Sequence, residues 1–176
     1  MLKTIFVVLI VLIVGILGFS ATRSDTFRVQ RSATIKAPAD RVYGMISDFH
    51  QWSTWSPWEK LDPAMKKTYG GAANGTGATY AWEGNNKVGQ GNMEITHATP
   101  PAKVLIRLHF IKPFEATNTA EFTLRPVGGD TTEVTWAMFG PMNFISKVMC
   151  LFVSMDKMVG DDFATGLANL KANAEK

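Results

Sequence analysis

The chain has 176 residues, of which 46% are hydrophobic and 19% are charged, and its formal net charge is +3. Without its apolar N-terminal run the chain retains about 150 residues, which is the size of one domain with a hydrophobic core. This composition excludes a disordered chain. The basic residues are scattered and their largest cluster is Lys66-Lys67, which argues against a nucleic-acid partner.

The first predicted element is an apolar helix. Residues 5–19 read IFVVLIVLIVGILGF, without a polar side chain. With its flanking residues this run reaches about 19 residues, or roughly 28 Å as a helix, close to the hydrocarbon thickness of a bilayer. We therefore predict an uncleaved membrane anchor over residues 1–23. The alternative is a cleaved secretory signal, since Gly18 and Ser20 are small enough for a peptidase site, but the run is longer than a usual signal core.

The side of the membrane follows less directly from the sequence. Positive charges come after the apolar run, at Arg23, Arg28 and Arg31, and this bias favours a cytoplasmic location for residues 24–176. A short N-terminus that precedes a whole domain can nevertheless translocate whatever the nearby charge. We therefore expect the domain to be periplasmic or otherwise extracytoplasmic.

The remainder of the chain alternates with a period of two over most of its length, which is typical of half-buried strands. A first strand is expected over residues 27–35. Pro38 then suits the first turn of a helix, because its missing N–H would be unpaired there, and one or two short helices reach Phe49. Six more strands are expected at residues 66–69, 77–83, 87–96, 103–111, 116–125 and 132–139.

Short turns join several of these strands. Gly84-Asn85-Asn86 and Gly128-Gly129-Asp130 contain residues that tolerate positive φ, so both are predicted to be hairpin turns. From Pro141 onward the apolar period changes to three or four, which predicts one helix of up to about eight turns. The stripe consists of Ile145, Val148, Phe152, Met155, Val159, Phe163, Leu167 and Leu170.

This order of elements predicts an α+β fold. Consecutive strands with short turns form an antiparallel meander, and a curved sheet needs one face covered. The long C-terminal helix carries a matching apolar stripe. Gly160 and Gly166 lie within that helix, where each costs about 1 kcal/mol relative to Ala, so they indicate close packing or a bend.

Four stretches of the chain resemble a known superfamily. They are ATRSDTFRVQRSATIKAPADRVYGMISDFHQWSTWSPWEKLDPAMKKTY, YAWEGN, IKPFEATNTAEF and KMVGDDFATGLANLKA. These stretches resemble START-like (SRPBCC) proteins of the polyketide cyclase/dehydrase and lipid transport type, in particular a bacterial membrane-anchored subgroup. The resemblance covers nearly all of residues 21–175. It implies a helix-grip fold, in which a curved antiparallel sheet of about seven strands wraps around a long C-terminal helix and encloses a deep apolar cavity.

The strand faces agree with such a cavity. Alternation places apolar side chains together on one face of each of three strands, while Arg107 and His109 lie on the opposite face of the first. The inward sets are Val104, Ile106, Leu108 and Phe110; Ala120, Phe122 and Leu124; and Val134, Trp136 and Met138.

Aromatic and methionine side chains are the most unusual local features. Three indoles fall within WSTWSPW, residues 52–58, where they either form an aromatic wall for a ligand or fill the core, and the core interpretation is favoured. The Met- and Phe-rich region 138–158 is either a lining for variable apolar ligands, a bilayer contact, or ordinary core. The predicted cavity lining is Trp52, Trp55, Trp58, Tyr80, Trp82, Met93, Leu108, Phe110, Phe122, Trp136, Met138, Phe152 and Met155.

Reactive groups form no recognisable catalytic or metal motif. The histidines have no zinc-ligand spacing, and Cys150 lies among apolar residues, as a buried core cysteine does. Asp161-Asp162 is interpreted as a solvated face, and Glu83 is the best candidate for a polar group at the cavity mouth. We therefore expect no catalytic residue, no metal and no cofactor.

Three functions remain open, because a superfamily fold does not settle function. The first is binding or transport of a hydrophobic small molecule or lipid by a membrane-tethered protein. The second is a cyclase or dehydratase reaction, with Glu83, Tyr80 or His97 as its acid or base. The third is a protein-interaction module like a co-chaperone, which requires a filled interior and an exposed apolar patch.

Overall fold

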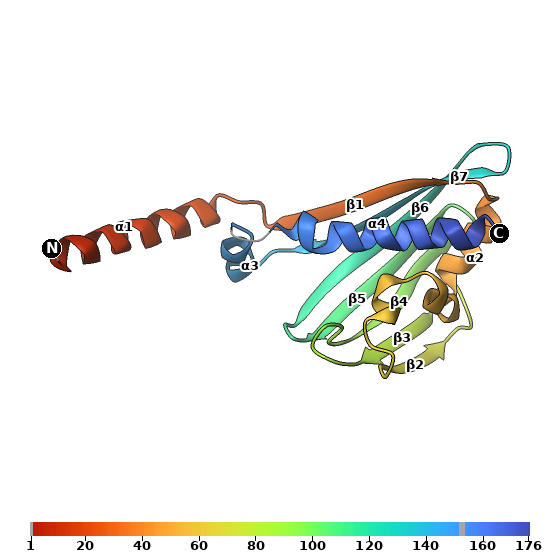
Figure 1. Cartoon of the computed structure of the whole chain (residues 1–176), viewed down its shortest axis with the longest axis horizontal. Helices are drawn as coiled ribbons and strands as arrows, with labels where there is room; N and C mark the ends of the chain where they lie inside the picture. The colour runs from red at the N-terminus through yellow and green to blue at the C-terminus, as the bar shows by residue number, and fades with distance from the viewer. Residues whose placement is uncertain (1, 152–153) are drawn as a thin grey trace.

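The computed structural model describes residues 2–151 and 154–176 and contains an N-terminal helix followed by one sheet with helices on one face (Figure 1). The N-terminal half contains α1 (Leu2–Ala21), β1 (Thr26–Ile35), α2 (Ala39–Ser47), the 3-10 helices η1 (Phe49–Thr54) and η2 (Pro57–Lys60), β2 (Lys66–Gly71) and β3 (Ala78–Glu83). The C-terminal half contains β4 (Gln90–Thr99), β5 (Lys103–Lys112), β6 (Ala116–Gly128), β7 (Thr131–Pro141), α3 (Phe144–Met149) and α4 (Met155–Ala174).

The sheet has seven antiparallel strands in the order β1-β7-β6-β5-β4-β3-β2. Each strand from β2 to β7 pairs with its neighbour in sequence, as expected of a meander. Strand β1 pairs with β7 and forms one edge of the sheet, and β2 forms the other edge. Gly128 and Gly129 both adopt positive φ between β6 and β7, which is the conformation that the predicted hairpin turn requires. The predicted helix-grip fold is confirmed.

Helix α4 covers the concave face of the sheet and lies mainly along β1. Two contacts fix its ends there. At its first turn the guanidinium of Arg31 donates to both carboxylate oxygens of Asp156, at 2.7 and 2.9 Å. Near its last turn Lys171 Nζ donates to the carbonyl of Thr34 at 2.8 Å. Between these contacts the buried side chains of Phe163, Leu167 and Leu170 point into the core.

The expectation of one continuous C-terminal helix is wrong. The chain forms two helices, and each has its own N-cap: Asn143 Oδ1 accepts from the amide of Ser146 at 2.8 Å, and Ser154 Oγ accepts from the amide of Lys157 at 3.4 Å. Asn and Ser compete for backbone amides in this way and so start helices instead of continuing them. The apolar stripe runs through both helices and conceals the break, and Phe152 lies outside the described residues.

Strand β4 also begins later than expected, at Gln90 instead of residue 87. Residues 84–89 form a loop, because the amide of Gly84 donates to the carbonyl of Gly89 at 2.9 Å. Gly89 has φ of +65°, and a side chain there would meet the backbone oxygen of Lys112. This loop therefore lies against the end of β5, where it contributes to the site described next.

Candidate ligand-binding site

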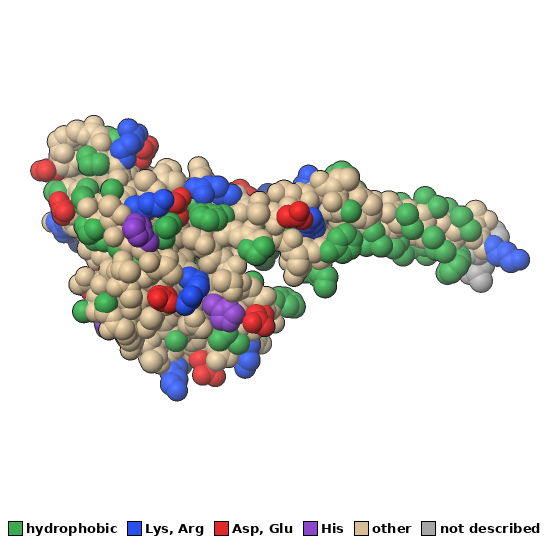
Figure 2. Space-filling model, turned by 180° about the vertical axis from the view of Figure 1, so that it is seen from behind, with side chains coloured by type: hydrophobic (Ala, Val, Ile, Leu, Met, Phe, Trp, Pro, Cys, Tyr) green, Lys and Arg blue, Asp and Glu red, His purple; other side chains and the backbone are tan. Residues whose placement is uncertain are grey.

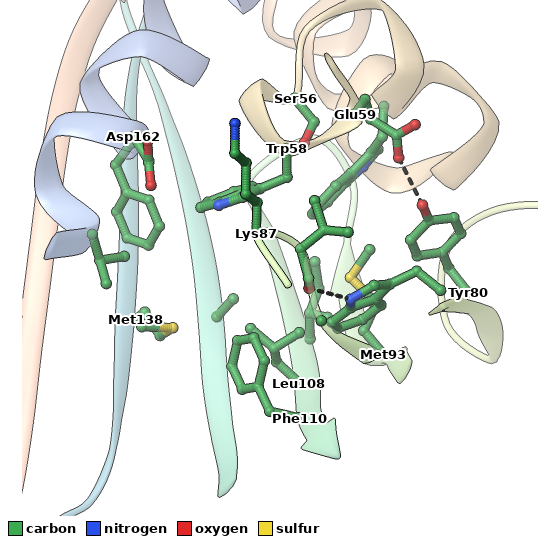
Figure 3. A pocket seen from close by; sticks show the side chains of 18 of the residues that line it. Ser56, Trp58, Glu59, Tyr80, Lys87, Met93, Leu108, Phe110, Met138 and Asp162 are labelled. Carbon is green, nitrogen blue, oxygen red and sulfur yellow. Dashed lines mark hydrogen bonds between the residues drawn. The ribbon is translucent and has the colours of Figure 1, made fainter. Parts of the chain in front are cut away.

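A cavity of about 300 Å³ lies between the concave face of the sheet, the η1–η2 segment and the first turns of α4 (Figure 3). Strand alternation forms its floor, because every second residue of each strand faces the same side. The lining from the sheet consists of Tyr80, Trp82, Met93, Ile106, Leu108, Phe110, Ala120, Trp136 and Met138. The lining from helices, loops and the last residue of β5 consists of Trp52, Ser56, Trp58, Glu59, Met65, Lys87, Val88, Gly89, Lys112, Pro113, Met158, Val159, Asp162 and Phe163.

The three tryptophans of residues 52–58 have different roles. Trp52 and Trp55 are buried, and their indole N–H groups donate to the carbonyls of Ile46 at 2.9 Å and Met45 at 3.1 Å. These bonds satisfy the only polar atom of each indole. Trp52 still borders the cavity, whereas Trp55 does not. Trp58 is half-buried and lines the cavity beside α4. Trp55 therefore fills the core, Trp58 forms part of an aromatic wall, and Trp52 does both.

Trp136 forms the aromatic wall between the cavity and the core. Its indole stacks between Phe163 of α4, with ring centroids 4.2 Å apart, and Phe122 of β6, with centroids 4.8 Å apart. Trp58 meets it edge-on at 5.7 Å. Aromatic pairs of this kind prefer offset stacking or edge-to-face contact, so the wall is closely packed.

The carboxylate of Glu59 is buried on the side of the cavity where Tyr80 lies (Figure 3). The side chain of Glu59 is only 6% exposed and forms an ion pair with Lys67. Its other oxygen accepts a hydrogen bond from the Tyr80 hydroxyl at 2.7 Å (Figure 3). Burial, reinforced by the charge of Glu59, raises the pKa of Tyr80 far above its ordinary value. Tyr80 therefore remains a neutral phenol and a hydrogen-bond donor over the physiological pH range.

Charged side chains gather where the cavity opens. Lys87, on the loop between β3 and β4, and Lys112, the last residue of β5, are exposed lining residues, and Asp162 lines the cavity from α4. Burial, together with the neighbouring charge of Asp161, raises the pKa of the Asp162 carboxyl. The site therefore combines a deep apolar body with a polar rim that carries both signs of charge, and this suits a ligand with one polar end.

Most of the predicted lining meets in this cavity: Trp52, Trp58, Tyr80, Trp82, Met93, Leu108, Phe110, Trp136 and Met138. Three predicted residues do not line it. Trp55 and Phe122 are fully buried in the core beneath it, and Met155 packs on that core from α4. The fourth, Phe152, lies outside the described residues.

The expectation for Glu83 is wrong. On β3 the side chains of Tyr80 and Trp82 point inward, so the next residue points to the opposite face, and Glu83 is exposed. His97 is also exposed and away from the cavity, where its Nε2 lies 3.0 Å from the Thr99 hydroxyl. Asp162, interpreted from sequence as a solvated face, instead borders the cavity.

Sequence reasoning gave Glu59 no role in the cavity, and it did not identify Lys87, Val159 or Phe163 as lining residues. Their places depend on where loops and α4 meet the sheet, which no local pattern specifies. Phe163 and Val159 do belong to the predicted apolar stripe, and this signal indicated burial without indicating a cavity. Among residues 2–151 and 154–176, no three His, Cys, Asp or Glu side chains converge as a metal site would require.

Comparison with known proteins relates this fold to solved structures. The Zhui aromatase/cyclase from Streptomyces sp. R1128 superposes with a TM-score of 0.62 at 14% identity, over 85% of this chain and 94% of that one. A protein from Chromobacterium violaceum gives 0.59 at 15% identity, over 86% and 98%. The Aha1 dimer from Colwellia psychrerythraea gives 0.57 at 17% identity, over 85% and 96%. No curated protein sequence matches this chain.

At such low identity these structures establish a shared fold and nothing about activity. The sequence itself carries a stronger match, because a family model described as polyketide cyclase/dehydrase and lipid transport fits residues 26–175. That range begins at β1 and extends to the residue after α4, so it contains every element of the sheet and of the cavity. The chain therefore belongs to the polyketide cyclase/dehydrase and lipid transport family of the SRPBCC superfamily.

Proposed function

We propose that this protein binds a hydrophobic small molecule or lipid in its cavity while α1 tethers it to a membrane. The observation that carries the proposal is the cavity of about 300 Å³, lined chiefly by aromatic, aliphatic and methionine side chains. Apolar walls with a few polar groups are the usual composition of ligand pockets, whose volumes run from about 300 to 1,000 Å³. The expected ligand is therefore small, such as an aromatic compound or a single acyl chain with a polar end.

The tether rests on the character of α1. Residues Lys3–Ala21 form a helix long and apolar enough to cross a bilayer, and almost none of it is buried against the rest of the described chain. A helix that is apolar on all sides needs an apolar environment. A signal sequence near the N-terminus can also meet these criteria of length and hydropathy, so we propose both the retained anchor and the extracytoplasmic location of the domain.

A matched pair of substitutions on β5 tests ligand binding. Leu108 faces the cavity, whereas Leu105 lies on the opposite face of the same strand. Leu108→Trp is expected to fill the cavity and to weaken binding of a fluorescent fatty acid at least tenfold, measured with the full chain in nanodiscs. Leu105→Trp should bind like the wild type. Equal affinities for the two variants would contradict the proposal.

A cyclase-type reaction is the second candidate function. The observation that favours it is that titratable side chains, Asp162 and the Glu59–Tyr80 pair, line the cavity. Burial raises the pKa of the Asp162 carboxyl, which is the direction that a general acid requires. If this chemistry occurs with dehydration, the wild type lowers the mass of a bound ligand by that of one water; if it is ring closure alone, the chromatographic retention of the ligand changes at constant mass. Asp162→Asn should cause neither change. Unchanged mass and retention with both proteins leave binding as the function.

The third alternative, a protein-interaction module, required a filled interior. The cavity does not meet that condition. The exposed apolar patch that the same alternative required is present, but its place next to α1 points to a different partner.

A further inference from the structure

Helix α3 is oriented with its apolar side chains outward. Ile145 is 70% exposed, Met149 is 52% exposed and Phe144 is 45% exposed. Its one charged side chain, Lys147, is only 7% exposed. Single exposed apolar residues are normal on a protein surface, but three on a helix of six residues, around a buried lysine, reverse the usual arrangement.

This orientation is fixed by the joint between α1 and the sheet. Lys147 forms an ion pair with Asp25, and the carbonyl of Asp25 accepts from the amide of Met142 at 2.7 Å. Helix α3 also contacts α1 directly, where Ser20 is fully buried. Rotation of α3 to hide its apolar face would break the Lys147 ion pair, so the exposed face is a built feature of the molecule.

The exposed face lies at the end of the domain from which α1 emerges (Figure 1). The β5–β6 hairpin points to the same end and carries Phe114, which is 73% exposed. In the space-filling view, hydrophobic side chains continue from α1 onto this end of the domain (Figure 2). If α1 crosses a bilayer, its C-terminal end places α3 at the level of the lipid headgroups.

The mouth of the cavity is close to this surface. Its exposed lining residues include Lys112 and Pro113, which immediately precede Phe114, and Met158 in the first turn of α4. Arg23 follows the end of α1 and Lys112 precedes Phe114 by two residues, so basic side chains adjoin these apolar segments along the chain, together with the exposed carboxylates of Asp25 and Glu115. Apolar side chains flanked by basic residues are typical of surfaces that bind the membrane interface.

We propose that the face of α3 formed by Phe144, Ile145 and Met149 lies in the interface of the bilayer that α1 crosses, and that the cavity takes its ligand from that bilayer. This inference rests on the proposed tether and deepens it. A second copy of the chain fits less well, because a stable dimer needs about 800 Å² per partner, more than one short helix offers. The continuity of the face with α1 points to lipid as its partner.

Depth-dependent quenching tests the docking without any ligand. A bimane label is attached to Ile145→Cys in the full chain with Cys150→Ser, reconstituted in vesicles that contain lipids brominated near the carbonyl. The matched control is the same label at Asp130→Cys, in the β6–β7 turn at the opposite end of the domain. We expect quenching at residue 145 at least threefold stronger than at residue 130, with blue-shifted emission.

Each outcome of this experiment decides the proposal. Equal quenching at both positions, with emission typical of water, overturns it. Blue-shifted emission at residue 145 that is not quenched by lipid and grows with protein density shows a second copy on this face, and also overturns it.

A functional test uses the double variant Ile145→Glu and Met149→Glu, because both native side chains are exposed, and circular dichroism checks that its fold is unchanged. Transfer of a fluorescent fatty acid from vesicles should slow at least fivefold, while its affinity in detergent stays unchanged. An unchanged transfer rate contradicts loading from the bilayer. A wild type that binds no fatty acid rules out an acyl chain as the ligand of the proposed function, and the quenching result still stands or falls by itself.

Discussion

Tyr80 and Glu59 form the buried polar contact of the cavity. Glu59 is the more demanding of the two, because an ionised carboxylate removed from water is tolerated only when it is paired and hydrogen-bonded. Lys67 supplies the charge and Tyr80 supplies a second donor. Removal of either partner leaves this buried carboxylate short of one contact.

Tyr80→Phe is therefore expected to lower the stability of the full chain by about 1.5 kcal/mol, since hydrogen bonds to charged groups contribute about 1.5–3 kcal/mol. Thermal unfolding in detergent measures this. The control is Tyr69→Phe, on the facing strand, because the Tyr69 hydroxyl makes no hydrogen bond within the described residues. Similar losses in both variants would show that the Glu59 contact contributes little.

The same pair predicts a pH effect. The pKa of Tyr80 is raised in the folded protein, so above about pH 10 the unfolded chain loses this proton while the folded chain keeps it. The unfolded state then binds fewer protons, and stability falls as pH rises. In melting curves between about pH 8 and about pH 11, Tyr80→Phe should therefore lose less stability than the wild type as the pH rises.

At the scale of elements, α4 approaches the sheet so closely that one position excludes a side chain. A methyl carbon on Gly166 would lie 2.8 Å from Trp136 Cζ3 and 3.2 Å from Pro57 Cδ. Displacement of the indole would disturb its stacking against Phe163 and Phe122. Gly166 therefore allows the contact between helix and sheet that forms the inner wall of the cavity.

Two glycine substitutions separate this packing role from helix propensity. Gly44 lies in α2, where a methyl group meets nothing within 4 Å, so Gly44→Ala should stabilise the protein by about 0.5–1 kcal/mol. Gly166→Ala gains the same propensity but overpacks the core, which costs about 1–3 kcal/mol, and a net loss of about 1 kcal/mol is expected. Calorimetry of both variants checks the opposite signs. Stabilisation by Gly166→Ala would show that α4 can shift away from Trp136 and Pro57 enough to accommodate the methyl group.

For the whole molecule, the chain places α1 at one end and its C-terminus at the other (Figure 1). The family match covers residues 26–175 and therefore does not include α1. It establishes the fold of the domain but does not concern its attachment to a membrane. The positive charges after α1 and the length of the following domain favour opposite sides of the membrane. Only an experiment on the full chain decides between them.

Alkaline phosphatase fused after Lys176 is expected to be active in a bacterial host, because it needs the disulfides of an oxidising compartment. The protein should also remain in the membrane pellet at high pH with residues 1–23 present in its intact mass. The control is the same fusion without residues 1–23, which should stay in the cytoplasm and be inactive. A shorter intact mass and a soluble product would identify residues 1–23 as a cleaved signal.

The sequence by itself determined the number and order of the strands and the apolar faces of the strands and helices. Alternation at positions 104–110 and 134–138 and the apolar stripe at 155–170 fixed which side chains are buried, because a period of two or of 3.6 is a property of the local backbone. It also identified the apolar N-terminal helix and, through the resemblance, the family. The break before Ser154 was readable from a capping residue, but the continuous stripe concealed it.

Only the tertiary structure decided which buried residues face an open space. Trp55 and Trp58 have the same chemistry and lie three residues apart, yet one is core and the other borders the cavity. Glu83, expected at the cavity mouth, points away from it because of its position on β3. Asp162, expected on a solvated face, lines the cavity because of the way α4 packs on the sheet. The physical reason is that a cavity is a mismatch between surfaces that meet across long sequence distances, and no local period records it.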